Sequence, residues 1–412
     1  MTMRTTVIAS HRQSAYGFSL IEMMVAIAIG IILSIGLVQV MVAGKTAAQA
    51  TQGANFMQEN ARFAMSQLSY SLQMADHWGP TNPDKGSATA AAQNAFNAIV
   101  AVCPGLLSAS GTTYVTGQNW WTLGTFGMSG SDGDPKSVLG NDCLPEWDDT
   151  SASDTIVLRY ADSNFIQCVD VGCATTTPAG AVVGASLYVR TAVGKNMVLA
   201  TGGDISALAL QNYASIAPLD AGYYESPDHA NQDGLYTFPY RIEIYYIRKC
   251  STPIGAACTT ASDNGSPIRT LWRRRLGNDG VFALEPVVEG IDHVELEYGL
   301  ASDNVAGGAI PIRFSDVQTY SSAHDVGVGS NSFNWLKVTS VRVGLLAQGD
   351  SFNSSGTRGN VGQQYLQGNR YLGSDTGGAY VPVSSSGSGT AAPMLQYAVF
   401  TTSGQLRNRD RG

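Results

Sequence analysis

The chain has 412 residues, a formal net charge of −8 and only 14% charged residues, and it contains 46 glycines. Its length gives room for two or three domains of roughly 100 to 200 residues each. Low charge with abundant Gly and short apolar runs is typical of a β-rich exterior protein and argues against a helical cytosolic enzyme. The negative charge also argues against a general nucleic-acid binder, because nonspecific affinity for phosphates comes from clustered Lys and Arg.

The N-terminus combines a polar leader with a long apolar run. Residues 1–17 contain two arginines and a histidine, have no acidic residue and end at Gly17. Residues 18–43 are apolar over a length that can cross a bilayer, for which a helix needs about 20 residues. An ordinary secretory signal places its apolar region before the cleavage site, whereas here the polar leader comes first.

Glu22 is the one charged residue of the apolar run. A carboxylate at the centre of a bilayer costs about 2.5 to 3.5 kcal/mol, so Glu22 is expected to have a partner. Cleavage after Gly17 would create an α-amine on Phe18, and this amine could neutralise Glu22 within or between chains. The alternative is a plain signal anchor in which Glu22 lies near a membrane edge.

The string GFSLIEMMVAIAIG, residues 17–30, resembles the class III signal peptide of type IV prepilins and pseudopilins. The resemblance implies that a prepilin peptidase cuts after Gly17 and methylates the new terminal amine of Phe18. It also implies that Glu22 pairs with the Phe18 amine of a neighbouring subunit during assembly.

The helix is expected to continue as an amphipathic segment over residues 44–78. Apolar residues recur there at steps of three and four, from Met57 to Ala75, which is typical of a helix with one buried face. The sequence Asp76–Pro80 predicts its end, because Gly and Pro terminate helices. Four glycines lower the helical propensity and are expected sites of bending or local melting, namely Gly30, Gly36, Gly44 and Gly53.

The remainder of the chain predicts an irregular segment followed by a β-rich head. Residues 79–153 are rich in Gly, Ser, Ala, Asn and Asp and are expected to form an irregular insertion, in which at least one of Trp120 and Trp121 packs into a core. Strands are expected at residues 155–161, 185–191, 240–248, 269–276, 281–288, 293–300, 335–348 and 395–402.

Three strand segments carry more detailed expectations. In residues 240–248, alternation places Tyr240, Ile242, Ile244 and Tyr246 on one face and Arg241, Glu243 and Tyr245 on the other. Residues 277–280, Gly-Asn-Asp-Gly, predict a hairpin between the strands before and after them. The apolar phase shifts between Val338 and Val341, which predicts a β-bulge near Thr339 and Ser340.

Six cysteines form an even set without a CxxC motif, which favours disulfides in an exported domain over a metal site. Other connectivities stay open, but the favoured pairs are Cys168 with Cys173, Cys250 with Cys258, and Cys103 with Cys143.

The C-terminal half extends the resemblance, since residues 287–300 and 335–348 resemble core strands of PilW-like pilus assembly proteins. The expected fold class is α+β, with a pilin-like N-terminal helix packed on an antiparallel β-sheet head that has disulfide-bearing loops. The expected divisions are a leader (1–17), a transmembrane and assembly half of the helix (18–43), an amphipathic half (44–78), the irregular insertion (79–153) and the head (154–412).

Signals for catalysis or ligand binding are weak. The sequence has no HExxH, P-loop, GxGxxG or GxSxG motif, so neither an enzyme nor a cofactor or metal is expected. Acidic loops at residues 131–134 and 148–154 leave calcium as an alternative to solvated turns, although neither has EF-hand spacing. Arg273, Arg274 and Arg275 could suggest a basic patch, but strand alternation separates Arg274 from the other two.

The resemblance implies a minor pilin that primes assembly of a type IV pilus and joins it, at the tip, from an inner-membrane position with its head in the periplasm. The implied partners are the prepilin peptidase, other minor pilins, the major pilin, inner-membrane lipid before assembly and a tip adhesin; nucleic acid is not expected. The output of the pilus stays open among twitching motility, cell adhesion and DNA uptake. The alternatives are a minor pseudopilin of a type II secretion system and a membrane-anchored adhesin or carbohydrate-binding protein.

Overall fold

The computed structural model describes most of the N-terminal helix and the strands that follow it. The described residues are 17, 19–79, 87–103, 127–140, 142–147, 153–168, 176–177, 182, 184–192, 197–206, 235–265, 267–277, 280–301, 317–321, 335, 338–349, 366–367, 370–371 and 397–405. The chain divides into two compact units, Met1–Thr51 and Gln52–Gly412, and helix α1 contributes residues to both.

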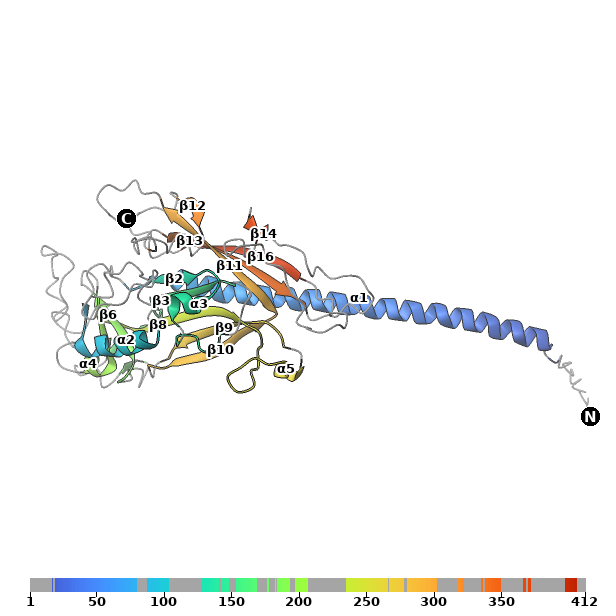
Figure 1. Cartoon of the computed structure of the whole chain (residues 1–412), viewed down its shortest axis with the longest axis horizontal. Helices are drawn as coiled ribbons and strands as arrows, with labels where there is room; N and C mark the ends of the chain where they lie inside the picture. Colours follow the sequence, from blue (N-terminus) through green and yellow to red (C-terminus); the bar gives the residue numbers. More distant parts are fainter. Residues whose placement is uncertain are drawn as a thin grey trace, which may run out of the picture. The chain divides into compact units, whose positions relative to one another are not determined.

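Helix α1 spans Leu20–Met74 (Figure 1). Within the second unit its buried residues recur at steps of three and four, as one face of a helix requires, and they include Met57, Ala61, Ala64 and Leu68. The helix ends where the sequence predicts, because Asp76 adopts a left-handed φ of 63° and its amide turns away to donate to the carbonyl of Arg159. It also runs unbroken through all four of its glycines, so no melted segment interrupts it.

Residues 79–153 are more regular than the sequence suggests. They contain β1 (Ser87–Ala88), α2 (Ala90–Val102), β2 (Met128–Ser131) and α3 (Pro135–Leu139). Helix α2 forms because Thr89 caps it, accepting a hydrogen bond from the Ala92 amide at 3.1 Å, and because its apolar side chains fall on one buried face. The expectation of a wholly irregular insertion is therefore wrong for the described part of this segment, whereas Trp120 and Trp121 lie outside the described residues.

The larger sheet is organised around one long strand, β8 (Leu235–Arg248). Its order is β1-β7-β6-β8-β3-β2, with β9 also paired to β8 and β10 paired to β9, and all described pairs except β1 with β7 are antiparallel. The other strands of this sheet are β3 (Thr155–Ala161), β6 (Leu187–Ala192), β7 (Val198–Thr201), β9 (Thr270–Leu276) and β10 (Phe282–Glu289). The predicted hairpin is confirmed as β9 and β10.

The smaller sheet has the order β12-β11-β13-β16. Its strands are β12 (Val317–Ser321), β11 (Ile291–Ala301), β13 (Val338–Gln348) and β16 (Tyr397–Gln405). The register slips where Gly299 pairs with Ser340 while Leu300 pairs with Val338, which leaves Thr339 as the extra residue. The predicted bulge is confirmed at that residue.

The remaining described elements are short. They are β4 (Gln167–Cys168), β5 (Thr176–Thr177), α4 (Gly202–Ser206), α5 (Ser262–Gly265), β14 (Leu366–Gln367) and β15 (Arg370–Tyr371).

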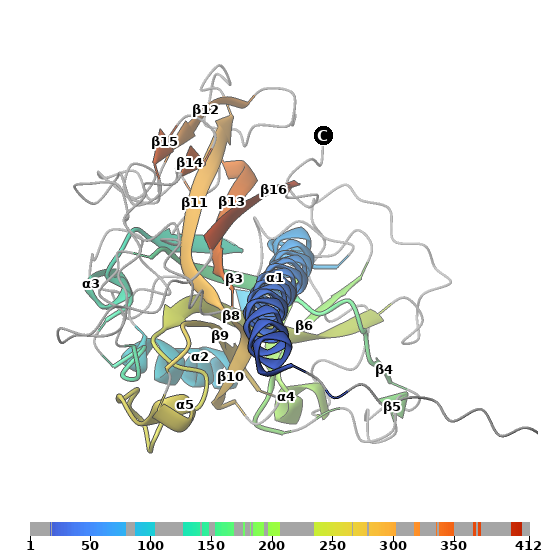
Figure 2. The same cartoon turned by 90° about the vertical axis from the view of Figure 1, so that its right-hand side faces the viewer.

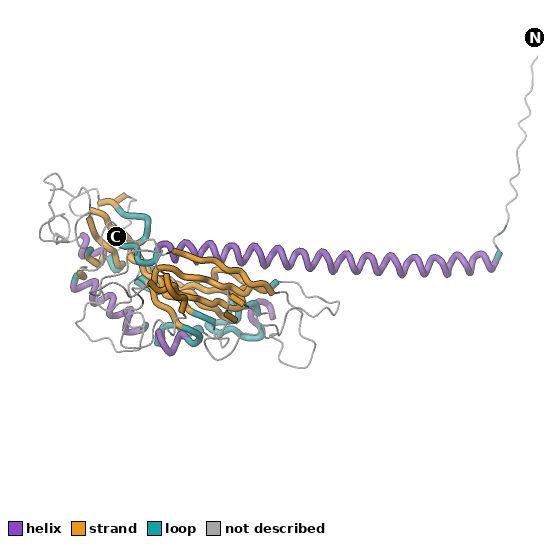
Figure 3. The backbone as a smooth tube through the Cα atoms, turned by 90° about the horizontal axis from the view of Figure 1, so that it is seen from above, coloured by secondary structure: helices purple, strands orange, loops and turns teal. Residues whose placement is uncertain are grey.

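The larger sheet is buried on both faces, which explains why the side chains of β8 are almost all inaccessible. Tyr240, Ile242, Ile244 and Tyr246 face one core together with α2. Tyr245 and Ile247 face a second core, which α1 shares with β11 and β13. Figures 2 and 3 show the strands of the two sheets near the head segment of α1. The fold is α+β, with one long N-terminal helix and a head of mostly antiparallel strands.

Two disulfides close loops of the head. Cys103 at the end of α2 is bonded to Cys143, and Cys250 after β8 is bonded to Cys258. Both pairs are the ones favoured from the sequence. The third expected pair, Cys168 with Cys173, lies outside the residues whose side chains are described and stays a prediction.

Candidate assembly helix and its anchorage in the head

The first turn of α1 carries the acidic residue singled out by the sequence. Glu22 lies there as an exposed side chain, close to the amide groups that a helix leaves unpaired at its N-terminus. Gly17 and Ser19 are exposed, and the Ser19 carbonyl accepts the Met23 amide at 3.1 Å. Phe18 lies outside the described residues, so the position of the proposed α-amine stays a prediction.

The surface of α1 is apolar all round over its first half. Sixteen large apolar side chains from Leu20 to Val42 are exposed, with relative exposures from 52% to 79%. Cβ atoms added at Gly30, Gly36 or Gly44 would meet nothing within 4 Å. This is the one described helix long and apolar enough to cross a membrane. Such a surface is unfavourable in water and requires lipid or other protein to cover it.

The second half of α1 is covered by the head itself. Its apolar stripe joins a core with residues from both sheets, among them Tyr245 of the larger sheet and Val343 of the smaller one. Gly290, with a φ of 75°, lets the chain turn closely past Phe56 and Asn60, and the side-chain Nδ2 of Asn60 donates to the Glu289 carbonyl at 2.9 Å. The helix is therefore attached to the head by apolar packing over several turns and by specific hydrogen bonds.

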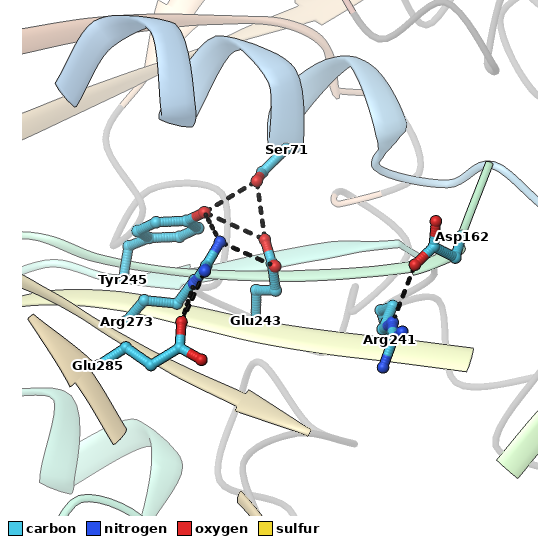
Figure 4. A network of polar contacts seen from close by, with 7 residues as sticks. All are labelled: Ser71, Asp162, Arg241, Glu243, Tyr245, Arg273 and Glu285. Atoms are coloured by element: carbon cyan, nitrogen blue, oxygen red, sulfur yellow. Dashed lines mark hydrogen bonds and ion pairs between the residues drawn. The ribbon is translucent and has the colours of Figure 1, made fainter. Parts of the chain in front are cut away.

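A buried polar network ties α1 to the larger sheet (Figure 4). The Ser71 hydroxyl donates to Glu243 Oε2 at 2.7 Å and lies 2.8 Å from the Tyr245 hydroxyl, which itself donates to Glu243 Oε2 at 3.1 Å. Arg273 Nη1 lies 3.4 Å from Glu243 Oε1, and Arg273 Nη2 lies 2.6 Å from Glu285 Oε2. The single buried carboxylate of Glu243 thus has a cation, a phenol and a helix hydroxyl as partners, as a buried charge requires.

Two groups of this network, Tyr245 and Arg273, have raised pKa values. Burial and the neighbouring Glu243 carboxylate raise the pKa of Tyr245, so its phenol stays neutral and can donate. Burial alone would lower the pKa of Arg273, but its Tyr245, Glu285 and Glu243 neighbours raise it further. Tyr245 and Arg273 are therefore expected to keep their protons across the physiological pH range.

The three consecutive arginines do not form a common basic surface. Arg273 takes part in the network under α1, whereas Arg274 bonds to the Cys143 carbonyl, lies 3.5 Å from Glu146 Oε2 and stacks over Phe282. The predicted separation of Arg274 from Arg273 is confirmed.

The first acidic loop forms structural contacts. Asp134 caps α3 by accepting the Lys136 amide at 2.8 Å. Among the described residues, no group of three or more His, Cys, Asp or Glu side chains could hold a metal ion. Asp148 and Asp149 of the second loop lie outside the described residues.

Asp154 joins the two sheets, a role that sequence reasoning missed. Its amide donates to the Val294 carbonyl at 2.9 Å, and its carboxyl accepts the Leu296 amide at 2.7 Å. Burial, with Glu295 and Asp132 nearby, raises the pKa of Asp154 well above its ordinary value. The position of Asp154 directly before a strand was visible in the sequence, but its partner 142 residues further along the chain was not.

Two family models match the chain. Residues 12–38 match the prokaryotic N-terminal methylation motif, and residues 244–408 match the type IV pilus-assembly protein W family, PilW. The two matches support a PilW-like type IV pilin. No curated protein and no solved structure matches it.

The two matches cover the exposed part of α1 and the C-terminal strands of the head. The methylation motif spans Gly17, Glu22 and most of the exposed apolar surface of α1, and the PilW match begins within β8 and extends beyond β16. This PilW-like pilin is anchored in the inner membrane by α1 and is incorporated into the pilus fibre. Both families are structural rather than enzymatic.

Proposed function

We propose that this pilin is a minor pilin that primes assembly of a type IV pilus and occupies a position at or near its tip. The observation that carries the proposal is the combination of a PilW-family head with a methylation-motif helix whose apolar surface is wholly exposed in the single chain. The helix is suited to pack with other pilins. The large head suits a tip position, where a subunit has fewer steric neighbours.

The proposed maturation follows from the methylation motif. The prepilin peptidase cuts after Gly17 and methylates Phe18, and residues 18–43 then serve as membrane anchor and assembly segment. Glu22 pairs with the Phe18 amine of a neighbouring subunit, because a carboxylate left alone in an apolar environment costs about 2.5 to 3.5 kcal/mol. Other minor pilins and the major pilin are the proposed neighbours, a tip adhesin is a proposed further partner, and twitching motility and adhesion are the proposed outputs.

The proposed division of the chain keeps the leader at 1–17, the amphipathic half of the helix at 44–78 and the head at 154–412. Residues 79–153 contain α2 and β2, both of which pack into the head, so this segment serves as an elaboration of it. The head then determines which subunits lie next to this pilin.

Mass spectrometry of the mature N-terminus tests the processing. Protein from cells with the prepilin peptidase should begin at methylated Phe18, and protein from cells without it should keep Met1. An uncut terminus in both strains would overturn the proposed maturation and favour a signal-anchored binding protein.

A deletion strain tests the assembly role. Few surface pili, restored by the intact gene, would support priming. The methylation motif is shared with pseudopilins, so a strain that keeps its pili but loses secreted enzymes would instead support a minor pseudopilin of a type II secretion system. Normal pili and secretion with lost surface binding would support the membrane-anchored adhesin or carbohydrate-binding protein.

A further inference from the structure

Ser153 and Asp154, which directly precede β3, connect the larger sheet to β11 of the smaller one. The Asp154 amide donates to the Val294 carbonyl at 2.9 Å, and the Asp154 carboxyl accepts the Leu296 amide at 2.7 Å. The Ser153 hydroxyl accepts the Val294 amide at 3.0 Å. We refer to Ser153, Asp154 and Val294–Leu296 as the sheet junction. Because Asp154 is buried, with an exposed fraction of 3%, its charge state bears directly on how firmly the junction holds.

The pairing of β2 with β3 brings a second carboxyl group to the sheet junction. Ser131 pairs with Thr155 at the end of this antiparallel ladder. The residue after Ser131 is Asp132 and the residue before Thr155 is Asp154, so the antiparallel register continues to place these two carboxyl groups opposite each other. Like charges in opposing positions are destabilising, so the pair is unfavourable when both groups are ionised.

Strand β11 brings a third carboxyl group from the other side. The hydrogen bonds from Asp154 reach Val294 and Leu296, the residues that flank Glu295 in the chain. Glu295 is itself buried, and its Oε2 lies 3.2 Å from Nε2 of His293. Asp154 therefore lies between two other acidic residues, and the nearby imidazole is paired with Glu295.

Asp154 differs in its partners from other buried carboxyl groups of the head. Glu243 is paired with Arg273 and Asp292 with Arg269, at nitrogen–oxygen distances of 3.4 and 3.0 Å. In the described part of the chain Asp154 takes part in no ion pair, and its carboxyl is held by backbone amides. A buried carboxylate without a countercharge is costly, so ionisation of Asp154 is unfavourable at this place.

The titratable groups that face Asp154 among the described residues are two carboxyl groups and a phenol, namely Asp132, Glu295 and Tyr298. Burial, followed by repulsion from Glu295 and Asp132, raises the pKa of Asp154 well above its ordinary value. Burial and the same aspartates raise the pKa of Tyr298, so the phenol stays neutral. These surroundings favour the neutral acid at Asp154 for the same reason that the geometry does.

We propose that the sheet junction is a pH-dependent contact, which holds the smaller sheet to the larger one while Asp154 is a neutral acid and opens when that side chain ionises. The neutral acid keeps an oxygen that accepts the Leu296 amide, and it places no charge beside Asp132 and Glu295. Opening exposes Asp154 to water, where it ionises at its ordinary pKa. The closed junction thus binds one more proton, and its stability falls as the pH rises from the ordinary pKa toward the raised one.

Asp154→Asn tests this contact, because asparagine keeps an acceptor for the Leu296 amide and is uncharged at any pH. Hydrogen exchange of residues 291–301, measured on the full chain in detergent at about pH 5 and pH 8 and corrected for intrinsic rates, reports the opening of β11. In the parent chain the opening equilibrium should rise by roughly tenfold or more, since release of one proton allows up to about tenfold per pH unit. Asp154→Asn should abolish this rise.

Asp134→Asn is the matched control, because it removes a charge from the same segment and keeps a residue that can cap α3. Its exchange should rise with pH as in the parent chain. The proposal is overturned if the parent chain shows no rise, if Asp154→Asn shows the full rise, or if Asp134→Asn loses it.

Infrared spectroscopy of the parent chain covers the case in which Asp154→Asn does not fold. Labelling with carbon-13 aspartate identifies the carbonyl stretching band of a protonated aspartic acid by its isotope shift. The folded chain at neutral pH should show such a band, and the band should disappear on alkaline titration as exchange of residues 291–301 increases. Absence of a protonated aspartate at neutral pH would overturn the proposal. Neither experiment uses the pilus, so the result is independent of the proposed priming role.

Discussion

The two halves of α1 have the same secondary structure and opposite surroundings. From Leu20 to Val42 every large apolar side chain is exposed, whereas from Gly53 to Leu72 the apolar face is buried against the chain's own sheets. The first half carries one carboxylate on an apolar surface, and the second half has a hydroxyl bonded to a buried carboxylate of the head. The same helix is therefore stabilised in two ways. Other molecules must cover its first half, whereas the head covers its second half.

The comparison shows where each half must be tested. Substitutions in the first half should alter assembly and leave the head's free energy of unfolding unchanged. Substitutions on the buried face of the second half should lower the head's free energy of unfolding and should not act directly on assembly. The largest expected effect on assembly belongs to Glu22.

Glu22→Gln should abolish most incorporation into pili. Glutamine would leave the proposed partner amine without a countercharge in an apolar environment, at a cost of about 2.5 to 3.5 kcal/mol. This cost predicts that the incorporated fraction of the pilin falls by roughly 100-fold. Quantitative immunoblotting of sheared pili against total protein measures it. Glu59→Gln, an exposed position in the second half, is the matched control and should incorporate normally. Equal recovery of both variants would contradict the assembly role of Glu22.

Leu68→Ala should be the most destabilising of the head substitutions. Leu68 is fully buried against the sheets, and truncation of such a leucine costs about 2 to 5 kcal/mol in the free energy of unfolding. Chemical denaturation of the full chain in detergent, followed by near-ultraviolet circular dichroism, measures this change. Leu37→Ala, at an exposed position of the first half, should leave the transition of the head where it was. Similar shifts for the two variants would break the contrast between the halves.

Ser71→Ala isolates the polar part of the attachment. It removes a 2.7 Å hydrogen bond to Glu243 and leaves that buried carboxylate with Tyr245 and Arg273, so a loss of about 1 to 3 kcal/mol is expected. The same denaturation experiment measures the loss. Ser66→Ala, on the exposed face of the helix, is the control. If the control matched Ser71→Ala, helix propensity and not the network would be the cause.

The smallest effect concerns the pH dependence of the head's own stability. Partial burial raises the pKa of Asp263, but hydrogen bonds from the amides of Ile268, Ser251 and Thr252 outweigh burial and hold it below 3.8. A carboxyl whose pKa is lowered by folding stabilises the folded state at any pH above its pKa in the unfolded chain. This contribution is lost as the pH falls through the pKa of the folded state.

Asp263→Asn should therefore lower the melting temperature at pH 7 and have a smaller effect in strong acid. Melting curves of the variant and the parent chain at both pH values measure the difference. If the difference in melting temperature between variant and parent chain were the same at both pH values, the lost hydrogen-bond geometry, and not the charge, would account for the effect.

Local patterns predicted much of the fold. The alternation in β8 placed Tyr240 and Tyr245 on opposite faces, and the phase shift at Thr339 located the bulge, because side-chain periodicity is set by the backbone. Helix α2 was missed because its Ala-rich sequence lies in a segment dominated by turn formers, where only the Thr89 cap marked a beginning.

Contacts between distant segments were not predictable in the same way. Glu243 was expected opposite the core face of β8, but its bond to Ser71 joins residues 172 positions apart, and no local pattern records that pairing. The same holds for Asp154 and Leu296. Gly17, Phe18 and Glu22 were singled out by a motif that a peptidase would read, which makes them visible in the sequence even though cleavage itself stays a prediction.

The attachment of α1 to the head also has a mechanical consequence. A pulling force along the helix axis enters the head through the second half of α1, where it is opposed by packing over several turns and by the Ser71–Glu243 bond at the same time. These contacts are loaded in shear, so many must yield together before the helix slides. The head should thus resist extraction under tension far better than a domain held by a single terminal strand or flexible linker.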